Sequence, residues 1–94
     1  MSTQEVRILS YFSLPTDLAA ASRDWPEFQS GDGYNVDLAT ATQTVQVRLV
    51  EPVNEDPYVT VIGHGNGRLF EQVLGAVMYA LGKHSDNLIV DRVS

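Results

Sequence analysis

The run LFEQVLGAVMYAL, residues 69–81, carries the strongest structural pattern in the chain. Its apolar residues recur every three to four positions, which is the period of an amphipathic helix. The run predicts a helix over about residues 68–82, ending at Gly82 because glycine favours the position that closes a helix. The side chains on its apolar stripe are Leu69, Phe70, Val73, Leu74, Val77, Met78 and Leu81.

Strand-like segments flank this helix in the sequence. Residues 6–12, 58–62 and 87–93 are rich in β-branched, aromatic and other apolar residues, the composition that strands favour. Residues 58–62 follow a loop rich in proline and acids, so we expect them to pair antiparallel with the strand before that loop.

The middle of the chain alternates between apolar and polar residues, but the alternation changes phase. Apolar residues take even positions in 34–38 and odd positions in 45–49. Either a turn separates two strands or a bulge interrupts one long strand. The bulge is favoured because no Gly, Pro or Asn marks a tight turn there. The sequence Ser-Gly-Asp-Gly, residues 30–33, is typical of a turn or loop.

A second, shorter helix is predicted over residues 17–25. Four of its residues share one side at helical spacing, and Pro26 ends it because the residue before a proline avoids the helical region. These four residues are Leu18, Ala21, Ser22 and Trp25.

Together these elements predict one α+β domain over residues 1–94, with the order β-α-β-β-α-β. That order is typical of the ferredoxin-like, or split βαβ, arrangement, in which two helices cover one face of a small antiparallel sheet. Because the first helix is short, the alternative is an irregular α+β sheet packed on one main helix.

Composition restricts the function classes. The chain has 94 residues, a formal net charge of −6 and no cysteine. Such an acidic surface repels phosphate backbones, so direct binding of DNA or RNA is not expected. The absence of cysteine removes disulfides and thiol ligands, and the two histidines have no metal-ligand spacing, so neither a metal nor a cofactor is expected. No apolar run is long enough to span a membrane, and the chain is expected in the cytoplasm.

A glycine-rich segment joins the predicted strand at 58–62 to the long helix. Alternating glycines followed by a helix N-terminus can hold an anion or nucleotide, and an arginine at the end can grip a phosphate. The spacing matches neither the dinucleotide fingerprint nor the P-loop, so a structural connection is the competing interpretation. The candidate ligand-binding residues are Gly63, His64, Gly65, Asn66, Gly67 and Arg68.

The face of the long helix opposite its apolar stripe is unusually rich in small residues. Gly75 lies in mid-helix, where glycine is unfavourable, and it would allow another backbone to approach closely. We therefore expect an interface on this face, unless loops such as residues 25–34 fold over it. The candidate interface residues are Glu71, Gln72, Gly75, Ala76, Tyr79 and Lys83.

These observations favour a non-catalytic protein–protein interaction domain, with a regulatory, inhibitory or accessory role. Its expected partner is another protein, which the net charge would allow to be basic, or a second copy in a homodimer. The alternative is a small-molecule binder that holds an anion or nucleotide on residues 63–68. An enzyme with His64 as its acid–base residue is the least favoured hypothesis, because no nucleophile or carboxylate adjoins that histidine in the sequence.

Overall fold

Six strands and two helices make up this computed structural model, which describes residues 3–10, 18–82 and 88–93. Neither helix in those ranges is long and apolar enough to cross a membrane. The elements in chain order are β1 (Thr3–Ser10), α1 (Leu18–Ser22), β2 (Phe28–Asp32), β3 (Asn35–Ala39), β4 (Gln43–Val50), β5 (Tyr58–Gly65), α2 (Leu69–Gly82) and β6 (Leu88–Arg92).

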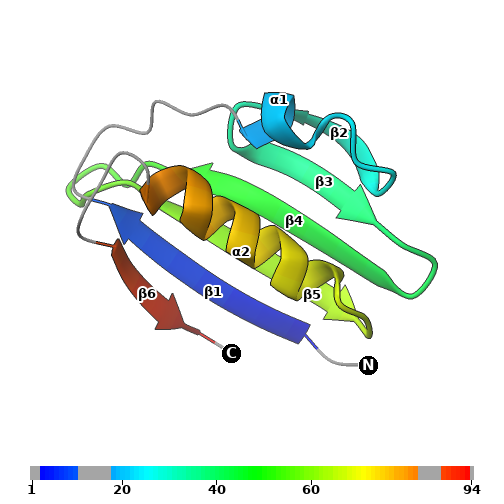
Figure 1. Ribbon diagram of the computed structural model, residues 1–94. Coiled ribbons are helices and arrows are strands. Elements are labelled where there is room, and N and C mark those ends of the chain that lie inside the picture. Colours follow the sequence, from blue (N-terminus) through cyan, green and yellow to red (C-terminus); the bar gives the residue numbers. More distant parts are fainter. Residues whose placement is uncertain (1–2, 11–17, 83–87, 94) are drawn as a thin grey trace.

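The strands form one sheet in the order β2-β3-β4-β5-β1-β6, and every neighbouring pair is antiparallel. The two outer strands of the sheet are β2 and β6, each of five residues (Figure 1). The expected antiparallel pairing of residues 58–62 with the preceding strand is confirmed, with Val61 opposite Val47. On its other side Val61 lies opposite Val6 of β1.

Both helices lie on the same face of the sheet (Figure 1). Alternate strand residues point toward them because successive side chains in a strand point to opposite faces. The valines at 6, 36, 45, 47, 59 and 61 form a layer from which solvent is excluded, and Phe70 and Val77 of α2 pack on it. The main core therefore sits between the sheet and α2, with Leu18 and Ala19 of α1 extending it over β3.

The predicted order β-α-β-β-α-β and the ferredoxin-like topology are wrong. The chain is an α+β fold with the order β-α-β-β-β-β-α-β, because it contains two strands that the sequence pattern does not separate. Residues 28–32 form β2, and the region from 35 to 50 is divided into β3 and β4.

A turn, not a bulge, separates β3 from β4. The Thr40 hydroxyl accepts hydrogen bonds from the backbone N–H groups of Thr42 (3.3 Å) and Gln43 (3.1 Å). The Thr40 N–H in turn donates to the carbonyl of Gln43 at 2.8 Å. The Thr40 side chain thus stabilises the turn by hydrogen bonds to the backbone, so the turn forms without the Gly or Asn that usually marks one.

The strand β2 was not predicted, because its residues Ser30, Gly31 and Asp32 are of the types that usually form turns. Only Gly33 and Tyr34 lie between β2 and β3, and Gly33 has a φ of 61°, as the tight hairpin requires. Of the turn expected at residues 30–33, residues 30–32 are therefore the end of β2, and Gly33 is the first residue of the hairpin turn. The pairing also shifts register between Phe28 and Ser30, which removes the simple alternation that indicates a strand.

The long helix agrees with its prediction in extent but not in every side chain. The structure places Leu69, Phe70, Val73, Val77 and Leu81 in the core. Met78 is 36% exposed and lies outside it, whereas Ala80 is only 7% exposed and lies on the buried side. Ala80 lines the space between α2 and α1, so the buried side of α2 faces the neighbouring helix as well as the sheet.

Candidate functional site

An apolar groove of about 240 Å³ lies between α1 and α2. We call it the α1–α2 groove. Its lining residues are Leu18, Ala21, Ser22, Trp25, Ala76, Tyr79 and Ala80.

The α1 wall of the groove follows from helical spacing. The four residues that the sequence places on one side of this helix are the four that line the groove, which confirms their common orientation. Although α1 ends at Ser22, the N–H of Trp25 donates to the carbonyl of Ser22 at 2.9 Å, so the chain keeps turning and Trp25 stays on that side. The Ser22 hydroxyl donates to the carbonyl of Leu18 at 2.8 Å. The hydroxyl group of Ser22 is therefore satisfied within α1.

The α2 wall of the groove is made of small residues beside one large aromatic residue. Ala76 and Ala80 are four positions apart and therefore lie one turn above the other. Their short side chains leave the space that longer ones would fill. Tyr79 borders the same space and is 68% exposed. On the α2 side the groove is thus lined by two alanines, and Trp25 and Tyr79 are its largest lining side chains.

The structure places most of the predicted interface residues on the exposed side of α2. Glu71, Gln72, Gly75 and Tyr79 are exposed. Ala76 is half-buried in the groove, and Lys83 lies outside the described residues. The alternative was that residues 25–34 cover this face of α2. Of these residues only Trp25 lines the α1–α2 groove.

Two glycines of the glycine-rich segment pack closely against other parts of the chain. Gly63 is buried in β5, where a Cβ atom would come within 2.7 Å of the Phe70 ring. Gly65 has a φ of 94°, and a Cβ atom there would collide with the carbonyl oxygen of Thr42. These glycines allow β5 to approach α2 and the β3–β4 turn closely, which is the structural interpretation that the sequence left open.

The N-terminus of α2 already has an acceptor from within the protein. Gln43 is 4% exposed, and its Oε1 accepts a hydrogen bond of 3.1 Å from the backbone N–H of Phe70. One of the orphan N–H groups at the start of the helix is thereby satisfied. Sequence reasoning missed this cap, because Gln43 lies 27 positions before Phe70.

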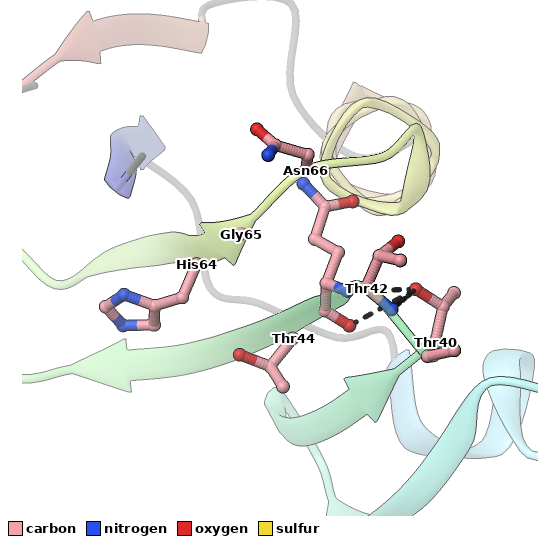
Figure 2. Close-up of a pocket in the computed structure, with 8 residues that line it drawn as sticks. Thr40, Thr42, Thr44, His64, Gly65 and Asn66 are labelled. Atoms are coloured by element: carbon pink, nitrogen blue, oxygen red, sulfur yellow. Dashed lines mark hydrogen bonds between the residues drawn. The ribbon is translucent and has the colours of Figure 1, made fainter. Parts of the chain in front are cut away.

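Three residues of the glycine-rich segment line a polar depression of about 430 Å³ (Figure 2). His64, Gly65 and Asn66 form one side of it, and residues 40–44 form the other. The His64 and Asn66 side chains lie apart and do not converge on one point (Figure 2). The His64 Nδ1 lies 3.2 Å from the Thr3 hydroxyl, and Arg68 is exposed outside the lining of the depression.

Within residues 3–10, 18–82 and 88–93, no group of three His, Cys, Asp or Glu residues is placed to hold a metal ion. No protein-family model, curated protein or solved structure matches the chain. The two candidate sites, the α1–α2 groove and the polar depression, therefore have to be judged by their shape and chemistry.

Proposed function

We propose that this chain is a non-catalytic interaction domain, a regulatory, inhibitory or accessory protein that binds another protein through the α1–α2 groove. The observation that carries the proposal is the groove itself, in which Trp25 and Tyr79 stand beside small apolar residues. Tryptophan and tyrosine are enriched among the residues that dominate protein–protein binding energy. Both helices pack on the sheet, and all the lining residues except Trp25, which lies in the turn after α1, belong to these two helices.

The size of the groove supports a protein partner over a small molecule. Its volume of about 240 Å³ lies below the roughly 300–1,000 Å³ of pockets that enclose drug-sized ligands. A space of this size suits one or two apolar side chains of a partner. The surrounding surface would then form the rest of the contact.

The charge near the groove favours apolar contact as the basis of binding. Arg23 and Asp24 separate the lining residues Ser22 and Trp25 in the sequence, and both are exposed. Glu71 is the only charged residue of α2. The net charge of −6 is therefore carried mostly elsewhere, where it would add a long-range attraction for a basic partner.

A photo-crosslinking amino acid at position 79 is expected to form adducts with a protein in the native host, whereas the same group at position 53 is not. Val53 is 97% exposed in the β4–β5 loop, so it reports non-specific collisions. Substituting Ala76→Gln should lower the adduct yield at position 79 several-fold, because a longer side chain fills the groove. Adducts are read by mass spectrometry, and equal yields at positions 79 and 53 would contradict the proposal.

The polar depression supports a second candidate function, the binding of a small anion or nucleotide. His64, Gly65 and Asn66 line it, and its volume is within the range of ligand pockets. Its support is weaker, because Gln43 already accepts from a helix N–H group and the depression is open, whereas ligand pockets enclose most of their ligand.

This second candidate predicts that phosphate-bearing ligands raise the melting temperature by about 2 °C or more at saturating concentration. The shift should disappear in Arg68→Ala, because that arginine adjoins the segment and would pair with the phosphate. Arg92→Ala is the matched control, since it removes the same charge from β6. No shift across a broad panel of nucleotides and sugar phosphates, measured by differential scanning fluorimetry, would remove this candidate.

A further inference from the structure

The strand β6 forms one edge of the sheet, and some of its backbone groups point outward. The N–H of Val93 donates to the carbonyl of Glu5 in β1 at 2.9 Å. In an antiparallel pair, residues that exchange hydrogen bonds alternate with residues that do not, so Asp91 also bonds to β1. Val90 and Arg92 therefore direct their N–H and C=O groups to the outer edge, where no further strand follows in the described part of the chain (Figure 1).

Beside this edge, the face of the sheet away from the helices carries a pocket of about 420 Å³, which we call the β6 pocket. Its lining residues are Arg7, Leu9, Glu55, Asp56, Tyr58 and Asp91. Arg7 and Leu9 alternate along β1 with Val6 and Ile8, which are buried in the core, so they lie on the opposite, open face. Asp91 is paired with Arg7 in the sheet and therefore projects from the same face.

The β6 pocket holds three carboxylates and one guanidinium group. The guanidinium of Arg7 is engaged elsewhere, because its Nε donates to Glu5 Oε2 at 3.4 Å and its central carbon lies 5.3 Å from the centroid of the Tyr58 ring. The three carboxylates are exposed, and none of them forms an ion pair within the described ranges. The pocket therefore has an excess of negative charge, which is complementary to a cationic group.

We infer that β6 is a docking edge for an extended, basic segment of another protein, which adds a strand to the sheet and places a Lys or Arg side chain in the β6 pocket. In strand addition, backbone hydrogen bonds provide affinity and pockets for alternate side chains provide specificity. Val90 and Arg92 supply the first, and the pocket beside Asp91 supplies the second. This surface shares no residue with the α1–α2 groove, so the inference goes beyond the proposed function and does not depend on it.

The register of β6 determines which side chains such a strand needs. A residue opposite Asp91 projects from the open face, and its Cβ atom lies about 4.5–5.5 Å from that of Asp91, so a basic side chain fits there. The two neighbours of this residue bond to Val90 and Arg92 and project from the face that carries the helices. Val90 is 45% exposed on that face, where it pairs with the core residue Ile8, so an apolar neighbour would cover it.

The edge at β2 and the pairing of two copies are both less suited to strand addition. The pairing of β2 with β3 shifts register between Phe28 and Ser30, and bulges of this kind protect edges from further pairing. By contrast, β6 pairs with β1 over five consecutive residues without a shift. Pairing between two β6 strands would bring two acidic pockets together in chains that each carry a charge of −6.

A peptide titration followed by NMR tests the inference. The probe is acetyl-Thr-Val-Lys-Val-Thr-amide, whose lysine would face Asp91 and whose valines would bond to Val90 and Arg92. Binding is expected to shift the amide signals of Val90 and Arg92 and to slow their hydrogen exchange several-fold, because both N–H groups become part of a ladder. The same peptide with glutamate in place of lysine should not bind. Equal affinities for the two peptides, or unchanged amides at Val90 and Arg92, would overturn the inference.

Methylation of the peptide backbone separates strand addition from simple capture of a cation. Methyl groups on both valine nitrogens remove the donors that face β6 and should weaken binding by about tenfold or more. A methyl group on the lysine nitrogen, which points away from β6, should leave the affinity nearly unchanged. Equal losses from the two modifications, or binding of butylamine as tight as that of the parent peptide, would show that no strand is added and would overturn the inference.

Substitutions in the protein test the role of the pocket. Asp91→Asn is expected to weaken peptide binding by up to about fivefold, and adding Glu55→Gln and Asp56→Asn should weaken it further. Asp32→Asn is the matched control, because it removes the same charge from an exposed position of β2 at the other edge. The melting temperature should stay unchanged in all these variants, since their side chains are exposed. A loss from Asp32→Asn as large as that from Asp91→Asn would show that net charge alone attracts the peptide, and the inference would be wrong.

Discussion

Replacing Phe70 by alanine is expected to lower the free energy of unfolding by about 3–5 kcal/mol. Phe70 is 1% exposed and is the largest of the fully buried side chains. Its ring lies against Gly63 of β5, and it begins the stripe by which α2 packs on the sheet. Removing the ring leaves a cavity that backbone on both sides prevents from collapsing. Urea denaturation followed by the fluorescence of Trp25, the only tryptophan, measures the loss.

A small domain has roughly 5–15 kcal/mol of stability, so a loss of this size is a large fraction of the total, and the Phe70→Ala chain is expected to unfold at a markedly lower urea concentration than the wild type. Val53→Ala provides the matched control, because Val53 is 97% exposed and its loss should change stability by no more than about 0.5 kcal/mol. Phe70→Leu keeps most of the apolar volume and should fall between the two. Similar stabilities for the Phe70→Ala and Val53→Ala chains would show that α2 does not form the core described above.

Replacing Gly65 by alanine is expected to destabilise the protein by about 3 kcal/mol. Two costs combine at this position. A residue with a side chain is strained at a φ of 94°, and the added Cβ atom would collide with the carbonyl oxygen of Thr42, which belongs to the backbone of the β3–β4 turn. The same urea titration measures this loss, and it should occur without any ligand.

Gly33→Ala separates these two costs. Gly33 also has a positive φ, of 61°, but nothing lies within 4 Å of an added Cβ atom. Alanine at this position should therefore cost only about 1 kcal/mol, from backbone strain alone. The difference between the two variants is the cost of contact with the turn. If Gly65→Ala is no more destabilising than Gly33→Ala, the glycine-rich segment is free of the turn, and ligand binding becomes the better explanation of its glycines.

Much of the candidate site was predictable because it depends on helical periodicity. The residues at 18, 21, 22 and 25 share a side through spacing alone, and so do Glu71, Gln72, Gly75 and Tyr79 on α2. What spacing does not indicate is that these two sides adjoin one another. Trp25 and Tyr79 are distant in the chain, and only the packing of both helices on one sheet brings them to the same groove.

The prediction of the element order was wrong for a related reason. A tight turn without glycine, proline or asparagine depends on the Thr40 hydroxyl, and a strand as irregular as β2 depends on its neighbour β3 for its hydrogen bonds. Neither dependence leaves a periodic signal. The sequence also offers two interpretations of the glycine-rich segment, and only the positions of Phe70 and Thr42 show which of its glycines are needed for packing.

The amino-acid sequence by itself determined the α+β class, the extent of α2 and the exposed side on which Gly75 lies, because these follow from interactions between residues a few positions apart. The tertiary structure alone decided the six-stranded order, the Gln43 cap on α2 and the existence of the groove. Each of these joins residues that are far apart along the chain, and their contact energies appear only once the sheet has brought them together.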